Sequence, residues 1–173
     1  MKTLFIVAFV ANIILNIVSI VILPERVAIH YGEAGIPNGW APNWVNALIM
    51  FGTDVLLFVS IWFAPYLTMK TPSKWLNLPH KDYWMKEENK PRMLAILTSL
   101  MHEIGAALLL FMFAIGLLSI LANLADPMRL NMPAFWVVFW ILMIYTVYWC
   151  VKLYVRFRVP SPPTTSSGEC FPS

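Results

Sequence analysis

Residues 104–124 read IGAALLLFMFAIGLLSILANL, an uncharged and almost wholly apolar run of 21 residues. A helix of about 20 apolar residues crosses the hydrocarbon core of a bilayer. The run can therefore span a membrane by itself, and it predicts an integral membrane protein. Composition agrees, because 60% of the 173 residues are hydrophobic and 12% are charged, whereas soluble domains carry about 25% charged residues.

Three further apolar runs predict three further membrane-spanning helices. The four expected spans cover residues 3–23, 44–69, 94–124 and 134–155. We expect residues 1–158 to form a single all-α domain, a four-helix membrane bundle. Residues 159–173 are rich in Pro, Ser and Thr, and this tail is expected to be disordered or held by a partner.

The positions of Lys and Arg predict the orientation. Ten of the twelve lie before the first run, between the second and third runs, or from Lys152 at the end of the fourth run onward. Arg26 and Arg129 are the other two. Because basic loops stay in the cytoplasm, both termini are expected on the cytoplasmic side of a plasma membrane. The basic side chains beside the spans are expected to meet lipid head groups, so the alkaline composition indicates the bilayer and not nucleic acid as partner.

Polar side chains inside the runs either join helices or form a site. Asn12 and Asn16 lie one turn apart in the first span, and Asp54 in the second is expected at the depth of Asn16. Asp54 has two interpretations, an Asp–Asn structural bond or a proton or cation site. His102 and Glu103 point about 100° apart on a helix and cannot share one face. We expect that pair at the cytoplasmic interface, near Lys90 or Arg92, in a structural role.

Small and polar residues form one seam along the third span. They recur at alternating intervals of four and three residues, a pattern that keeps one face toward a partner helix. Small residues on such a face let helix backbones approach closely. The pattern predicts that this helix is central and packs mainly through Gly105, Met112, Gly116 and Ser119. The complete seam is Thr98, His102, Gly105, Leu109, Met112, Gly116, Ser119 and Asn123.

The outside loop, residues 24–42, is expected to be compact. Val27 and Ile29 alternate with polar neighbours, as in a short extended segment, and Gly and Pro residues after them impose turns. His30 either senses external pH or stabilises a turn by a hydrogen bond. The candidate binding residues of this region are His30, Tyr31, Trp40 and Trp44.

The loop between the second and third spans interleaves aromatic and basic residues. Such a pattern is typical of a segment that lies in the plane of the membrane interface. The residues expected at the interface are Trp75, Lys81, Tyr83 and Trp84.

Motifs of enzyme chemistry are not recognised. The His102–Glu103 pair lacks the second His that a zincin helix needs, and there is no phosphate-binding loop or paired-Cys metal spacing. His30, His80 and His102 fall on opposite sides of the predicted membrane. We therefore expect no enzyme activity, no metal and no other cofactor, and we identify no small-molecule substrate.

Eight residues around the outside loop carry a family resemblance. They are Leu23, Pro24, Ile29, His30, Tyr31, Gly35, Pro37 and Trp40. Over about residues 1–70 the chain resembles an uncharacterised bacterial membrane domain found at the amino end of SdpI-type immunity proteins. The resemblance implies a small multi-helix protein of the bacterial inner membrane. Some members of that family protect against, or sense, a secreted toxic peptide.

Three functional hypotheses follow. The first is an accessory subunit or binding protein for another membrane protein or a larger membrane complex, favoured by the aromatic residues of the fourth span. The second is an SdpI-like immunity protein or sensor of an extracellular peptide. The third is a small proton- or cation-coupled transporter that uses Asp54 with Asn12 and Asn16.

Overall fold

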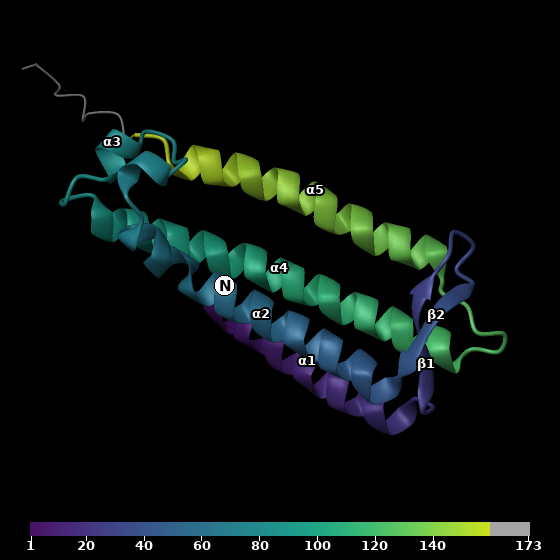
Figure 1. Cartoon of the computed structure of the whole chain (residues 1–173). Helices are drawn as coiled ribbons and strands as arrows, with labels where there is room; N and C mark the ends of the chain where they lie inside the picture. Colours follow the sequence, from purple (N-terminus) through teal and green to yellow (C-terminus); the bar gives the residue numbers. More distant parts are fainter. Residues whose placement is uncertain (160–173) are drawn as a thin grey trace, which may run out of the picture.

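The computed structural model describes residues 1–159, and four long helices dominate it (Figure 1). Each is long and apolar enough to cross a membrane. The prediction of four such helices is confirmed, and their bounds agree with the expected spans to within four residues. They are α1 (Lys2–Ile22), α2 (Asn43–Lys70), α4 (Lys90–Leu124) and α5 (Met132–Arg156).

Local sequence explains where the helices begin and end. Leu23 is extended after α1, because the residue before a proline is driven out of the helical region. Pro residues occupy the first turns of α4 and α5, where the missing N–H is not needed. The Asn131 side chain caps α5 by accepting a hydrogen bond from the Ala134 amide at 3.0 Å.

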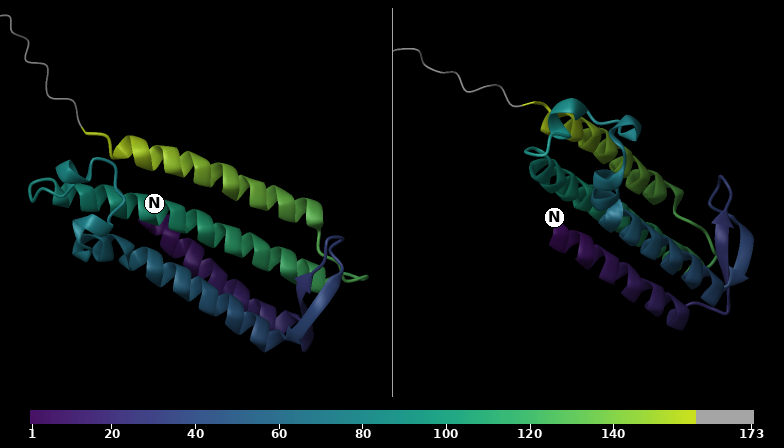
Figure 2. Two further views of the ribbon diagram at one scale, coloured as in Figure 1. Left: turned by 45° about the horizontal axis from the view of Figure 1, so that its top comes forward. Right: turned by 60° about the vertical axis from the view of Figure 1, so that its left-hand side comes forward.

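Helix α4 lies at the centre of the bundle. It packs against α1, α2 and α5. Figures 1 and 2 show α1 and α2 side by side along one flank of α4, with α5 along another. The other three helices are therefore positioned chiefly through α4.

Side chains of α1 and α2 approach the α4 backbone closely at two glycines. A Cβ atom at Gly105 would lie 2.6 Å from the Phe5 ring and 2.8 Å from the Ile61 methyl group. At Gly116 it would lie 3.0 Å from a methyl carbon of Leu15. Side chains of both helices thus pack directly on the α4 backbone. Met112 and Ser119 are half-buried on the same helix.

The loop between α1 and α2, expected on the outside, folds as a β-hairpin across one end of the bundle (Figure 2). Strand β1 (Arg26–Tyr31) pairs antiparallel with β2 (Pro37–Pro42). The extended segment around Val27 agrees with the sequence pattern, but the second strand is additional. Val27 and Ala28 are both buried and Ile29 is exposed, because the pairing register shifts between Ala28 and His30.

The opposite end of the bundle is closed by the loop between α2 and α4. It contains the 3-10 turn η1 (Ser73–Trp75) and the short helix α3 (Lys81–Trp84). Trp84 is buried against Met93, Leu97, Leu100 and Phe157. Its indole N–H donates to the Phe157 carbonyl at 2.9 Å, one of the carbonyls that a helix end leaves unpaired.

The position of Trp84 therefore differs from the expected one, because its side chain is buried and not in contact with lipid at the interface. The ends of α4 and α5 offer it an apolar pocket and a hydrogen-bond acceptor together. Trp75 is exposed, whereas Lys81 and Tyr83 are half-buried. Of the expected tail, residues 160–173 lie outside the described residues.

The close packing at Gly105 leads to a prediction for stability. Gly105→Ala should lower the free energy of unfolding by about 1–3 kcal/mol, because the methyl group overpacks the contact with Phe5 and Ile61. Gly52 is the matched control, since nothing lies within 4 Å of a Cβ built there. Gly52→Ala should be neutral or stabilise the helix by about 0.5–1 kcal/mol. Thermal unfolding in a mild detergent measures both, and equal shifts for the two variants would contradict close packing at Gly105.

Candidate functional site

A buried polar side chain of α4, Asn123, joins the hairpin to this helix. The Asn123 carbonyl oxygen accepts from the Ala28 amide at 2.7 Å, and its side-chain NH₂ donates to the Ala28 carbonyl at 3.1 Å. The same NH₂ donates to the Tyr31 hydroxyl at 3.1 Å. Asn123 thus pairs with β1 as a neighbouring strand would, and it satisfies backbone groups that are buried away from water. In the sequence, Asn123 appears only as a member of the seam.

An open pocket lies where the hairpin meets α2. Trp40 and Trp44 line it, and its volume is about 570 Å³. The Arg26 guanidinium lies 5.7 Å from the centre of the Trp40 ring, within reach of a cation–π contact. The remaining lining residues are Glu25, Ala41, Pro42 and Asn43. Aromatic surface and charges of both signs therefore share one concave site.

The four residues predicted to bind at the outside loop do not all meet there. Trp40 and Trp44 line the pocket together. His30 is exposed and hydrogen-bonds through its Nδ1 with the Asn38 side-chain carbonyl, which corresponds to the turn-stabilising interpretation. Tyr31 is half-buried and held by Asn123. His30 is therefore engaged by a hydrogen bond within the hairpin, and Tyr31 by a hydrogen bond from α4.

The polar residues of α1 contact two different helices. The Asn12 side chain donates to the Leu109 carbonyl of α4 at 2.8 Å. Asn16 donates to one carboxylate oxygen of Asp54 in α2 at 3.0 Å. Of the two interpretations of Asp54, the Asp–Asn bond is present in the structure. Asn12 and Asn16, one helical turn apart, therefore bind α1 to both α4 and α2.

The Asp54 carboxyl is buried, and its second oxygen has no hydrogen-bond partner within residues 1–159. A cavity of about 10 Å³ lies beside Asn16, lined also by Ser19, Asn46 and Ser119. About 10–15 Å³ is the least space that holds one water molecule. An ion-conducting role for Asp54 needs a wider path than this cavity, and it stays a prediction from sequence.

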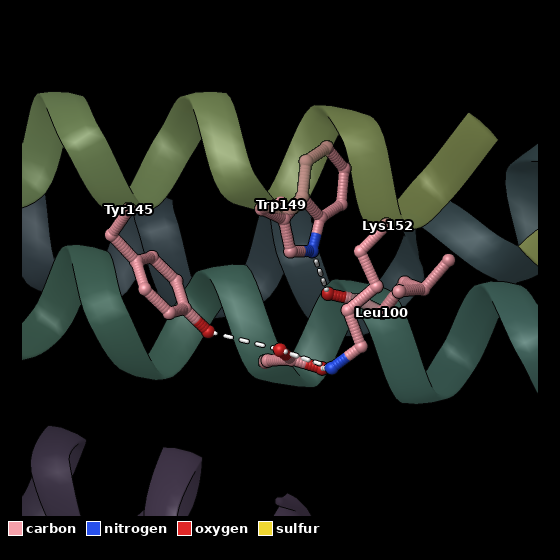
Figure 3. Close-up of polar contacts among 5 residues, drawn as sticks. Leu100, Tyr145, Trp149 and Lys152 are labelled. Carbon is pink, nitrogen blue, oxygen red and sulfur yellow. Dashed lines mark hydrogen bonds and ion pairs between the residues drawn. The ribbon is translucent and has the colours of Figure 1, made fainter. Parts of the chain in front are cut away.

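Glu103 is paired with α5 and not with the start of α4. The Lys152 ammonium lies 2.6 and 2.7 Å from its two oxygens, and the Tyr145 hydroxyl donates to it at 3.1 Å. Figure 3 shows Tyr145, Trp149 and Lys152 pointing from α5 toward α4, where the Trp149 indole donates to the Leu100 carbonyl at 2.9 Å. These bonds lock the second half of α5 onto α4.

Glu103 therefore does not lie near Lys90 or Arg92, contrary to the expectation from the sequence. Lys90 pairs with Glu87 at 2.6 Å. It lies thirteen residues before Glu103 in α4, about 20 Å along the helix axis, too far for a side chain to reach. A buried carboxylate needs a partner at its own depth, and Lys152 supplies it from the antiparallel helix.

His102 faces the other flank of α4, as its separation from Glu103 requires. Its ring lies 5.5 Å from that of Phe5 and 5.4 Å from that of Trp62. The Lys2 ammonium sits 5.0 Å from the centre of the Trp62 ring. His102 thus belongs to an aromatic contact among α1, α2 and α4. In the part of the chain that the structure describes, no three His, Cys, Asp or Glu side chains gather as a metal site.

Comparison with known proteins identifies one domain. Residues 7–53 match the Domain of unknown function (DUF1648). The match covers most of α1, the hairpin and the first part of α2, and so it includes the Trp40–Trp44 pocket. No curated protein and no solved structure matches the chain. The chain is similar to this domain over residues 7–53, and Glu103 with its partners lies beyond the match.

Loss of the Asn123 amide should loosen the hairpin. Asn123→Leu leaves the buried Ala28 N–H without its partner, at a cost of about 1–3 kcal/mol, and leaves the Ala28 carbonyl with only the 3.5 Å contact from the Tyr31 hydroxyl. Amide hydrogen exchange at Ala28 should accelerate, and thermal stability should fall. Asn77→Leu, in the exposed loop at the opposite end, is the control and should change neither. Unchanged protection at Ala28 in the Asn123 variant would show that the hairpin does not depend on this contact.

Proposed function

We propose that this chain is a non-enzymatic membrane protein that binds another membrane protein as an accessory subunit, and that α5 provides the contact. The observation that carries the proposal is the sparse packing of this helix. Leu142 is the one buried residue of α5, and α4 is its main neighbour. Most of its surface is therefore free to contact lipid or another helix.

The outward face of α5 has the chemistry of a helix-packing surface. Trp136, Trp140 and Tyr148 are exposed on it, whereas Tyr145 and Trp149 turn inward and hydrogen-bond with α4. Large aromatic rings add contact area, and the indole N–H and phenol O–H seek acceptors when buried. Helices in a bilayer associate through such packing and hydrogen bonds, because lipid removes the hydrophobic drive.

The proposed membrane placement rests on charge. Ten of twelve Lys and Arg side chains belong to the chain start, to residues 70–92 (the end of α2, the loop after it and the start of α4), or to the last residues from Lys152 on. Positive loops remain on the cytoplasmic side. We therefore assign that end to the cytoplasm of a bacterial inner membrane, with both termini inside and the hairpin outside.

Copurification tests the accessory role. In mild detergent the full chain should bring down a membrane protein in stoichiometric amount. A variant with Trp136→Ala, Trp140→Ala and Tyr148→Ala should lose this companion. The control changes exposed apolar residues of α2, Leu48, Leu56 and Phe63, to Ala and should retain it. A clean monomer of the unaltered chain would count against the proposal, as would equal retention by both variants.

The pocket at the hairpin supports a second candidate, recognition of an extracellular peptide. Two exposed Trp rings, Glu25 and Arg26 surround a volume of about 570 Å³. Aromatic anchors with flanking charges are typical of sites that bind peptides. The pocket also falls in the segment that resembles the amino end of SdpI-type immunity proteins. An immunity or sensing role would place the receptor surface here.

Sensitivity to secreted peptide toxins tests this second candidate. Deleting the gene should increase sensitivity, and the unaltered chain should restore resistance. Trp40→Ala with Trp44→Ala should fail to restore it because the pocket loses its aromatic walls. Ile36→Ala, an exposed position at the hairpin turn that does not line the pocket, should restore it fully. The same sensitivity with and without the gene would exclude this role.

A further inference from the structure

An apolar groove runs between α1, α4 and α5 at the level of the bundle where α1 begins. Its volume is about 500 Å³, within the range of about 300–1,000 Å³ typical of ligand sites. Glu103 and Tyr145 are the polar residues of its lining. The apolar walls include Leu4, Ala107, Leu110, Phe111, Ile141 and Leu142.

The groove arises from the way α5 is fastened. Its cytoplasmic half is held by the Trp149–Leu100 and Lys152–Glu103 contacts. At the other end, the Leu130 amide donates to the Gly35 carbonyl of the hairpin loop at 2.9 Å. Between these attachments Leu142 is the one buried residue of α5, and α1 lies on a different flank of α4 (Figure 2). Apolar space is therefore left in the middle.

A second, polar pocket adjoins the groove. Its volume is about 250 Å³, and Lys152 and Arg156 line it together with Ser99. Met1 and Glu103 line both cavities, so the two meet at Glu103. The result is one site with an apolar slot and a charged mouth. That mouth lies level with the first residue of α1, where the membrane surface is expected.

The charge of the mouth favours an anion. Glu103 is the one acidic residue among the lining residues of the two cavities, and Lys152 and Tyr145 already satisfy it. Arg156 is exposed and forms no ion pair with an acidic side chain of residues 1–159. Its guanidinium is therefore a positive charge of the site that has no ion-pair partner among these residues. A guanidinium presents paired N–H donors that suit a phosphate.

We propose that this two-part cavity binds one anionic phospholipid of the bilayer, with an acyl chain in the groove and the phosphate at Arg156 and Lys152. The proposal goes beyond the accessory role, since it concerns the α1–α4–α5 groove and not the outward face of α5. The bound chain fills space between α1 and α5 that no side chain occupies. A partner helix would fill the slot but would leave the charge of Arg156 unmatched.

Retention of lipid through purification tests the proposal. The full chain is reconstituted with equal amounts of phosphatidylglycerol and phosphatidylcholine that carry identical acyl chains. Native mass spectrometry then counts each lipid that stays bound. We expect one retained phosphatidylglycerol, preferred about fivefold, because one basic residue near the surface contributes about 1 kcal/mol toward an anionic lipid.

Two variants separate the head-group contact from the groove. Arg156→Gln should abolish the preference for phosphatidylglycerol, whereas Arg158→Gln, two residues further and outside both cavities, should keep it. Ala107→Phe fills the slot and should reduce retention of both lipids, with folding verified by thermal unfolding. Equal binding of the two lipids by the unaltered chain would overturn the proposal. So would unchanged retention in Ala107→Phe, or a peptide in place of lipid in the groove.

Discussion

Polar groups in a bilayer have no water to bind, and each must find a partner inside the protein. Helix α4 supplies most of these partners. Its Asn123 pairs with the backbone of β1, its Leu109 carbonyl accepts from Asn12, and its Glu103 pairs with Lys152. Because these three contacts lie at different depths, the same helix positions the hairpin, α1 and α5. The rest of the architecture depends on this requirement.

The two ends of the bundle meet this hydrogen-bonding requirement in different ways. At the hairpin end, Asn123 makes a short two-stranded sheet into a fixed platform, and that platform holds Trp40 and Trp44 beside one pocket. Without such support an isolated hairpin is marginally stable. At the opposite end, the Trp84 side chain packs across the ends of α4 and α5 and hydrogen-bonds to the Phe157 carbonyl. Helix α5 is secured near its ends, which leaves both the apolar groove and the exposed aromatic face available for binding.

Several features of the site were predictable from particular residues. The positions of Asn16 and Asp54 along their helices indicated a common depth, and the adjacency of His102 and Glu103 required different faces. Other features were not predictable. Trp84 has the pattern of an interfacial residue, and its burial depends on Phe157, which is 73 positions away in the chain. The partner of Glu103 is 49 positions away, and no local pattern specifies which of several Lys residues reaches it.

The sequence by itself determined the number of long apolar helices, their approximate bounds and the glycine seam of α4. Those properties follow from local periodicity and from the length needed to cross a hydrocarbon layer. Only the tertiary structure decided that the Asn123 side chain hydrogen-bonds to the backbone of β1 and that Lys152 pairs with Glu103. It also decided that α5 lies apart from α1 and leaves a groove between them. Such outcomes depend on the relative placement of whole helices, because a buried polar atom pairs with whichever group the packing brings within about 3 Å.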